Sequence, residues 1–310
     1  MNVIEDTIDF DAYLAGPDES ASVRPASDWL NDVVAAFEQP QHLSGATLPW
    51  SSTHNIIRLR RGELTIWPGM SGHGKSMLTG QVVLGLMDQS ERVCIASMEM
   101  KPSSTMQRLC RQALGCNSPD RRDIQDLHTW TNSKLWLYDQ QGQVSPERIL
   151  AVARYCHGQL GVTHFVVDNL LSCGIAEDDY NGQKQFVLAL ATHAHDTGQS
   201  VHLLAHSRKG KDELTPPGKF DVRGSASITD LADNVFSIWR NRGKEMAQDE
   251  GRHEKDDDED ALLIVCKHRH GEWEGRIRLW FDRRSQTYLQ HPNEQPKAMN
   301  LLADDDTVEF

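Results

Sequence analysis

Several common signals are missing from this chain of 310 residues. Its six cysteines include no C-x-x-C pair, so we expect free thiols in a reducing cytoplasm rather than a disulfide framework. No apolar run approaches the length of a membrane span, and the first ten residues lack the basic region and apolar core of an export signal. We therefore expect a cytoplasmic protein that does not enter a membrane.

Metal-binding patterns and a positive net charge are missing as well. The 14 histidines form no H-E-x-x-H motif and no Cys/His spacing typical of zinc. The net charge of −13 argues against a broad basic face that coats nucleic acid, but it allows a few basic loops lining a narrow channel. The length is sufficient for one large α/β domain with appendages.

The clearest motif present is a phosphate-binding loop of the form G-x-x-x-x-G-K-[ST]. A short apolar run at 64–67 predicts a buried strand before the loop, and apolar residues at helical spacing predict a helix after it. Backbone N–H groups and a lysine hold phosphates in such a loop, while its serine binds Mg²⁺. We expect a protein that binds ATP, or another NTP or dNTP, with Mg²⁺. The residues expected at the nucleotide are Gly69, Gly72, His73, Gly74, Lys75, Ser76 and Met77.

Strand and helix signals alternate along the rest of the core, which predicts a mostly parallel sheet with helices on both faces. A closing β-hairpin region is expected at 276–290. Residues 116–131 look polar and irregular, and residues 243–260 look like a very acidic, exposed loop. The further strands are expected at 92–97, 134–138, 164–168, 200–205, 235–239 and 261–267.

We expect three parts. Residues 1–45 form an N-terminal arm, 46–292 the ATPase domain, and 293–310 an acidic tail. In the arm, Ser27 is expected to cap a helix over 28–37. The apolar face of this helix packs either on its own domain or on a neighbouring subunit.

Two acidic residues stand where core strands are expected to end. Asp168 closes the apolar run 165–167, at a position where an aspartate meets Mg²⁺ in this fold class, although many plain strands also end in Asp. Glu99 follows the strand after the phosphate-loop helix, so it is expected at the same sheet edge as Lys75. A carboxylate there orients and deprotonates an attacking water; the alternative is an exposed glutamate that opens a helix.

Three basic or histidine side chains also stand at strand ends. His206 follows the strand after Asp168 and is a candidate sensor of the γ-phosphate, or an ordinary strand-end histidine. Lys267 and Arg269 end a late strand and point the same way, as an arginine finger directed at the nucleotide of an adjacent subunit does. Surface charge is the alternative for this pair.

Two loops are candidates for contact with single-stranded nucleic acid. Small residues permit close backbone approach, helix-start amides hold a phosphate, and Arg and Lys supply charge. The alternative is solvated surface, which is the usual role of a short basic run. The candidate residues are Arg208, Lys209, Lys211, Arg223, Gly224 and Ser225.

Taken together, these segments resemble the helicase domain of the ring-forming, RecA-fold replicative helicases, the group of DnaB, Twinkle and the phage primase–helicases. The similarity covers roughly residues 45–290. It rests on the order of six segments: G-M-S-G-H-G-K-S, S-M-E-M, V-V-D-N, L-A-H-S-R-K, D-V-R-G-S-A-S-I-T-D and K-H-R-H-G. The resemblance implies a RecA-like P-loop NTPase core, with Glu99 as catalytic base and His206 as the switch between γ-phosphate and DNA.

The same resemblance implies more about the site. Arg223 with Gly224 and Ser225 would lie near DNA, Arg240 and Tyr288 near the base, and Lys267 with Arg269 at the neighbour's nucleotide. The resemblance implies an NTP-hydrolysing replicative helicase, phage-like because position 206 is histidine. It would move 5′→3′ on single-stranded DNA at a fork as a homo-oligomeric ring, a hexamer.

Two alternatives and one departure accompany this resemblance. A RecA-like DNA-dependent ATPase without unwinding activity is one alternative, and a nucleotide-gated loader or scaffold is the other. Too few residues precede 46 for a primase domain, so we expect a helicase-only chain. The acidic tail ends in Phe310 and resembles tails that dock on a polymerase, a primase or a single-strand binding protein, although most acidic tails only aid solubility.

Overall fold

The structure is a computed structural model that describes residues 25–38, 44–207, 214–216, 226–271 and 273–301. The chain divides into two compact units, Met1–Leu43 and Ser44–Phe310. None of the described helices is long and apolar enough to cross a membrane. All six cysteines are free thiols.

The first unit contains η2 (Ala26–Trp29) and α2 (Leu30–Glu38). The predicted Ser27 cap is wrong, because the first helical turn begins two residues earlier than predicted, at Ala26. Pro25 occupies the cap position, and its carbonyl accepts the N–H of Asp28 at 3.0 Å. The apolar side chains of the helix are exposed, from 43% for Val34 to 88% for Phe37.

The second unit is built on a nine-stranded sheet in the order β3-β2-β4-β5-β1-β6-β7-β8-β9. The strands from β3 to β6 run parallel, and β7, β8 and β9 continue the sheet antiparallel. This arrangement confirms the predicted mostly parallel sheet and its closing hairpin region. The strands are β1 (Leu64–Gly69), β2 (Val93–Ser97), β3 (Leu135–Leu137), β4 (His164–Asp168), β5 (Ser200–His206), β6 (Asn234–Arg240), β7 (Ala261–His268), β8 (Gly275–Asp282) and β9 (Thr287–Leu289).

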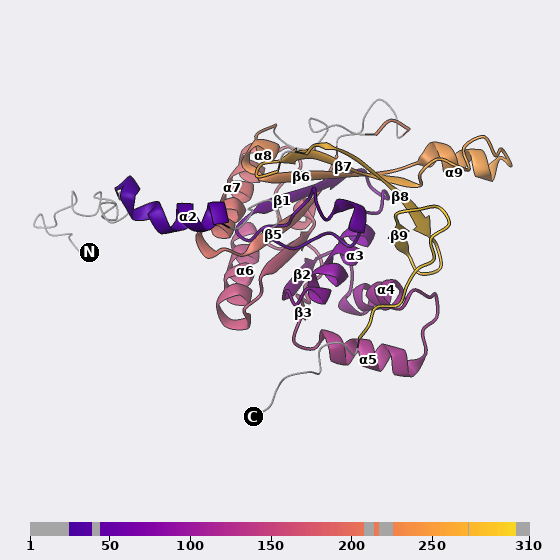
Figure 1. The fold of residues 1–310 in the computed structure, drawn as a ribbon, viewed down its shortest axis with the longest axis horizontal. Helices are drawn as coiled ribbons and strands as arrows, with labels where there is room; N and C mark the ends of the chain where they lie inside the picture. Colours follow the sequence, from indigo (N-terminus) through magenta and orange to yellow (C-terminus); the bar gives the residue numbers. More distant parts are fainter. Residues whose placement is uncertain (1–24, 39–43, 208–213, 217–225, 272, 302–310) are drawn as a thin grey trace, which may run out of the picture. The chain divides into compact units, whose positions relative to one another are not determined.

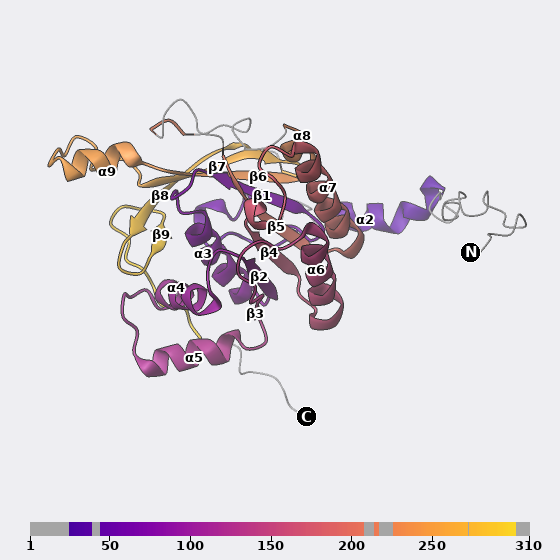
Figure 2. The same cartoon turned by 180° about the vertical axis from the view of Figure 1, so that it is seen from behind.

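Helices cover both faces of this sheet, as Figures 1 and 2 show from opposite sides. One face carries α3 (Lys75–Asp88), α4 (Pro102–Leu114) and α5 (Arg121–Thr131). The other face carries α6 (Pro146–Leu160), α7 (Tyr180–Thr197) and α8 (Ala226–Leu231). The remaining elements of this unit are η4 (Ser51–Thr53), η5 (Leu170–Ser172) and α9 (Arg242–Asp249).

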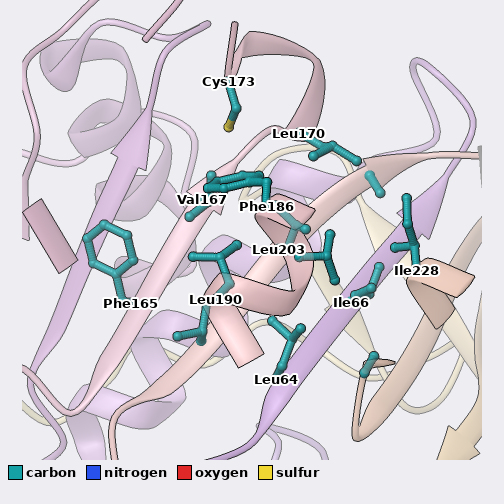
Figure 3. Packing of buried hydrophobic residues seen from close by; sticks show 14 of the residues in the cluster. Leu64, Ile66, Phe165, Val167, Leu170, Cys173, Phe186, Leu190, Leu203 and Ile228 are labelled. Atoms are coloured by element: carbon teal, nitrogen blue, oxygen red, sulfur yellow. The ribbon is translucent and has the colours of Figure 1, made fainter. Parts of the chain in front are cut away.

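Two hydrophobic cores lie on the two faces because successive strand residues point in opposite directions. Ile66 and Val167 belong to the core under α6–α8, whereas their neighbours Trp67 and Val166 belong to the core under α3–α5. Figure 3 shows the first core, in which strand residues meet Phe186 of α7. Burial on both faces explains why the strand sequences are continuous apolar runs rather than alternating ones.

Residues 116–131 contain a helix, so the prediction of an irregular segment is wrong. Helix α5 begins after Asp120, whose carboxylate accepts the N–H of Asp123 at 2.8 Å. Leu127 and Trp130 are buried in the core under this face. A helix at the periphery of a core needs only a narrow apolar stripe. In α5 this stripe is short and surrounded by polar residues, so the helical periodicity is not recognisable in the sequence.

The first part of the acidic stretch 243–260 is a helix, which corrects the prediction there, whereas residues 250–260 form the predicted loop, most of it exposed. Asn241 caps α9 by accepting the N–H of Lys244 at 3.0 Å. The Lys244 ammonium is buried and lies 2.8 Å from a carboxylate oxygen of Asp260. This contact joins α9 to the residue just before β7. In Figure 1, α9 projects beyond the ends of the strands.

The first part of the predicted tail lies against α4. The Met299 N–H donates to the carbonyl of Ala113 at 2.7 Å, and the side chains of Met299 and Leu301 pack on the adjoining core. Residues 302–310, which carry four of the five acidic residues of the predicted tail, lie outside the described part of the chain.

Candidate functional site

The candidate site lies at the carboxyl ends of the parallel strands, the edge where open α/β sheets bind their ligands. Gly69 at the end of β1 is in register with His206 of β5, and Ser97 of β2 with Asp168 of β4. A cavity of about 930 Å³ opens at this edge. The predicted residues that line it are Gly72, Gly74, Lys75, Ser76, Met77, Glu99, Asp168, His206, Arg240 and Tyr288.

The phosphate loop joins β1 to α3 and depends on left-handed glycines. Gly72 has φ +76° and Gly74, the N-cap of α3, has φ +84°. L-residues with a Cβ rarely adopt this conformation. A Cβ at Gly74 would also meet the hydroxyl of Tyr288. The loop therefore turns sharply enough to direct the N-terminus of α3 at the cavity, which favours binding of an anion there.

The ammonium group of Lys75 is held inside the loop. Its Nζ donates to the carbonyls of Gly69 at 2.8 Å and Met70 at 3.0 Å. Burial lowers the pKa of Lys75 to about 8, while the nearby carboxylates of Asp168 and Glu99 oppose that shift. A cation whose two shortest hydrogen bonds go to neutral carbonyls is ready to exchange them for phosphate oxygens, which are stronger acceptors.

Asp168 and Ser76 form the part of the site that fits Mg²⁺. Asp168 is 5% exposed, and its Oδ1 has no hydrogen-bond partner among the described residues. Burial raises the pKa of this carboxyl, and the proximity of Glu99 adds to the shift, whereas a hydrogen bond with Ser76 opposes it. A buried oxygen without a partner, beside a hydroxyl, is the kind of ligand set that Mg²⁺ prefers.

Glu99 and His206 are brought together by a residue that we had not predicted as part of the site. The side chain of Asn169 donates to Glu99 Oε1 at 2.6 Å and lies 3.3 Å from His206 Nε2. The other ring nitrogen of His206 lies 3.5 Å from Lys75 Nζ. Burial and the charge of Lys75 lower the pKa of His206, with Glu99 opposing. These contacts follow from the adjacency of β2, β4 and β5.

The two residues expected at the base, Arg240 and Tyr288, lie against the phosphate loop. Arg240 pairs with Glu245 at 2.5 Å, and its backbone N–H donates to His73 Nδ1 at 3.1 Å. His73 is fully buried, so its side chain supports the loop from inside rather than lining the cavity. Tyr288 is 4% exposed and packs on Phe281 with ring centroids 5.0 Å apart.

Lys267 and Arg269 lie at the opposite end of the strands from the cavity, where the parallel strands begin. Strand β7 runs antiparallel, so its end pairs with the beginning of β6, with Asn234 opposite His268. Lys267 Nζ donates to the carbonyls of Thr229 at 3.1 Å and Asp230 at 3.0 Å, near the C-terminus of α8. Neither Lys267 nor Arg269 lines the cavity of its own chain.

The residues predicted to contact nucleic acid cannot be placed. Arg208, Lys209 and Lys211 of the first loop, and Arg223, Gly224 and Ser225 of the second, lie outside the described residues. The first loop follows His206 directly along the chain, and the second precedes α8.

Two further residues belong to the site but were missed by the sequence analysis. Asn169 follows Asp168 at the same strand end, and its adjacency to a metal-ligand candidate was the available signal. Arg108 on α4 lines the cavity. Burial lowers the pKa of Arg108, and the opposing charges are those of Asp168 and Tyr288. No local motif marks Arg108, because only the packing of α4 beside the loop brings it there.

Comparison with known proteins places these features in a wider group. Residues 54–290 match the sequence model of the DnaB-like helicase C terminal domain. A DNA helicase/primase of Enterobacteria phage T3 is 24% identical over 212 residues, which cover 60% of this chain and 37% of that protein. The chain thus spans less than half the length of this curated relative.

Two solved structures share the fold. The ATPase domain of G40P superposes with a TM-score of 0.73 at 18% identity, over 86% of this chain and 99% of that chain. A DnaB-like replicative helicase, described together with its interactions with primase, gives a TM-score of 0.69 at 18% identity, over 90% of this chain and 70% of that chain. These similarities confirm the predicted RecA-like fold.

Proposed function

The chain belongs to the DnaB-like helicase family, and on this premise we propose that it is the NTP-driven motor of a replicative DNA helicase. It moves 5′→3′ on single-stranded DNA at a fork, as a ring of six identical chains in the cytoplasm of a bacterial or phage-infected cell. The observation that carries the proposal is the separation of two halves of one site. The residues assigned to nucleotide binding and hydrolysis line the cavity, whereas Lys267 and Arg269 lie at the opposite end of the strands.

The first half of the site binds the triphosphate. Lys75 and the amides at the start of α3 take the phosphate oxygens, and Ser76 with Asp168 holds Mg²⁺. When bound, this ion neutralises charge on the phosphates. Glu99 is exposed and lines the cavity. Its carboxylate orients a water and accepts its proton as the water oxygen bonds to the γ-phosphorus and the bond to the β-phosphate oxygen breaks.

The second half belongs to a neighbouring chain. Arg269 is 41% exposed and cannot serve its own cavity from the opposite sheet edge. In a closed ring, head-to-tail contact brings that edge of one chain to the cavity of the next. A guanidinium supplied in this way stabilises the negative charge that develops on the transferred phosphoryl group. Hydrolysis thus depends on assembly.

Contacts with DNA are assigned to the two basic loops at 208–211 and 223–225. Both are connected to parts of the site, since one follows His206 and the other precedes the helix whose carbonyls hold Lys267. Movement of the nucleotide-binding groups can therefore move the loops that bind the single-stranded DNA. The partners that we propose beyond DNA are a polymerase, a primase or a single-strand binding protein, reached through the acidic tail.

Unwinding of a forked duplex tests the proposal. We expect strand separation only with a 5′ single-stranded tail, with hydrolysable nucleotide and Mg²⁺, and not with the Lys75→Ala variant. The competing function is a RecA-like DNA-dependent ATPase that does not unwind. DNA-stimulated hydrolysis without strand separation on any fork would favour that competitor and overturn the proposed function.

A further inference from the structure

Asn169 contacts two groups of the hydrolytic site with one side chain. It follows Asp168 at the end of β4 and is 1% exposed. Its Nδ2 lies 2.6 Å from Glu99 Oε1 and 3.3 Å from His206 Nε2. The amide nitrogen carries two hydrogens, so it can donate to both acceptors at once. Two candidate groups, one just after β2 and one at the end of β5, are therefore linked through one amide.

The orientation of this amide is fixed by its other end. Asn169 Oδ1 accepts the backbone N–H of Leu171 at 3.0 Å, in the cap of η5. Rotating the amide by 180° would turn its oxygen to the Glu99 carboxylate and its nitrogen to a backbone donor. Both of these contacts would be repulsive. The nitrogen therefore points at Glu99 and His206.

An amide N–H directed at His206 Nε2 determines where the ring proton is. Both ring nitrogens face a donor, because Lys75 Nζ lies 3.5 Å from Nδ1 and can only donate. A neutral imidazole accepts at one nitrogen only. The Asn169 contact is the shorter of the two and comes from an amide of fixed orientation, so we assign the acceptor to Nε2 and the single proton to Nδ1. Burial and the Lys75 charge keep the ring neutral by lowering its pKa. The Nδ1–H group then faces Lys75 Nζ, 3.5 Å away. The Nδ1–H group of His206 and the ammonium of Lys75 then both donate toward the same point. An anionic oxygen, such as one of the γ-phosphate, can accept from both there.

We propose that Asn169 is a positioning residue that fixes His206 in its Nδ1–H tautomer, as a donor to the γ-phosphate, and holds the carboxylate of Glu99 at the same time. This inference rests on the proposed function, because it takes Glu99 and His206 as the groups that act on the γ-phosphate. It adds a physical link between them. A shift of His206 toward a phosphate oxygen moves the acceptor of one amide hydrogen, while the other hydrogen holds Glu99.

The tautomer of His206 is the direct test, measured by ¹⁵N–¹H correlation NMR on the full-length chain without nucleotide or DNA. His206→Gln identifies the resonance among those of the 14 histidines. In the unsubstituted protein we expect the proton on Nδ1. Asn169→Asp keeps the acceptor for Leu171 but replaces the donor by a carboxylate, so the ring proton is expected to move to Nε2 or the ring to become doubly protonated.

A matched substitution controls for buried capping asparagines in general. Asn241 is 8% exposed and caps α9 through the same kind of side-chain bond, but its amide nitrogen donates to the carbonyl of Glu259 instead of to Glu99 or His206. Asn241→Asp is expected to leave the His206 signal unchanged. A proton on Nε2 in the unsubstituted protein, or an unchanged tautomer in Asn169→Asp, would overturn the inference. The first of these measurements decides the matter even if the variant does not fold.

Kinetics give the second readout. Asn169→Asp is expected to lower kcat for DNA-stimulated hydrolysis at least tenfold while the Kd for nucleotide changes less than about threefold, since the phosphate loop is untouched. Equal losses in kcat and in nucleotide affinity would indicate a general structural role and overturn the inference. The tautomer experiment needs no turnover. An Nδ1 proton in a chain that unwinds no fork would therefore contradict the proposed function and leave this assignment intact.

Discussion

The guanidinium of Arg269 lies 3.0 Å from the carboxylate of Asp233 in the same chain. Asp233 is 1% exposed, and its other oxygen accepts the N–H of Leu64 at 2.9 Å and lies 3.2 Å from His195 Nε2. Because Arg269 is bound to a buried carboxylate, its half-exposed side chain can adopt only a few orientations. We infer that Asp233 fixes the direction in which the Arg269 side chain projects from the surface. This surface lies at the end of the strands away from the cavity of the same chain.

Arg269→Ala should therefore abolish DNA-stimulated hydrolysis, with a loss of about 10³–10⁵ in rate, and spare nucleotide binding. Mixing this variant with Lys75→Ala should restore part of the turnover, because some interfaces then pair an intact cavity with an intact arginine. Steady-state hydrolysis across mixing ratios measures the effect. The absence of any recovery, with both variants folded and assembled, would contradict an arginine acting between chains.

Gly74→Ala should weaken both folding and nucleotide binding. The substitution forces an L-residue to φ +84° and brings its Cβ against the Tyr288 hydroxyl. Gly142→Ala is the matched control, since Gly142 has φ +87° and nothing within 4 Å of an added Cβ. We expect the control to lose about 1–2 kcal/mol of unfolding free energy from the backbone term alone. Gly74→Ala should lose more, together with at least tenfold in nucleotide affinity.

The excess cost at Gly74 should be partly recovered by a second substitution. Tyr288→Phe removes the hydroxyl that the new Cβ meets, so Gly74→Ala/Tyr288→Phe should unfold at higher denaturant concentration than expected from the two single variants. Chemical denaturation of the four proteins gives the coupling free energy. Strict additivity would show that the hydroxyl does not oppose a side chain at position 74.

Stability should fall as the pH is lowered below about 6.5, because of a buried histidine pair. His164 Nδ1 and His202 Nε2 are 3.0 Å apart, and Trp67 Nε1 donates to His202 Nδ1 at 3.2 Å. Burial lowers the pKa of His164 to about 3, with Arg61 contributing, and lowers the pKa of His202 well below its usual value, with His164 contributing. The folded chain keeps both rings neutral.

The sign follows from proton uptake. Between pH 6.5 and about 3 the unfolded chain binds protons that the folded chain does not, so each ring removes up to about 1.4 kcal/mol of stability per pH unit. Urea unfolding at pH 7.0, 6.0 and 5.0 measures the slope. His164→Asn should reduce it by about one proton. An unchanged slope in this variant would show that His164 titrates normally in the folded chain.

Arg223→Ala should lower the affinity for single-stranded DNA and reduce the salt dependence of that affinity. Loss of one phosphate contact decreases the slope of log K against log salt by about 0.7 to 1. Arg122→Ala is a suitable control, because its side chain is 88% exposed on α5 and is not among the predicted DNA-contacting residues. A slope equal to that of the unsubstituted protein would remove Arg223 from the DNA surface.

Deleting residues 302–310 should weaken binding of a replicative polymerase without lowering hydrolysis. The segment carries four acidic residues and a terminal phenylalanine, so it can bind a basic groove with one apolar pocket. Pull-down with the polymerase and steady-state turnover are the two measurements. Loss of turnover on deletion would instead assign the segment to the motor domain.

The sequence by itself determined the phosphate-binding half of the site. Gly69, Gly74, Lys75 and Ser76 lie within eight consecutive residues, so strand, loop and helix N-terminus are local consequences of their order. The strands were predictable for the same reason, since burial on both faces makes them continuous apolar runs. Helices α5 and α9 were not, because their few apolar or anchoring residues are recognisable only against the surfaces they cover.

Only the tertiary structure decided how distant residues combine. Asn169 meets Glu99 and His206 because β4 lies between β2 and β5 in the sheet, an order that no local pattern specifies. Arg269 stands at the edge away from Lys75 because β7 reverses direction after β6. Strand order and direction follow from the packing of the whole sheet, and they determine which groups share a cavity and which are left for a neighbouring chain.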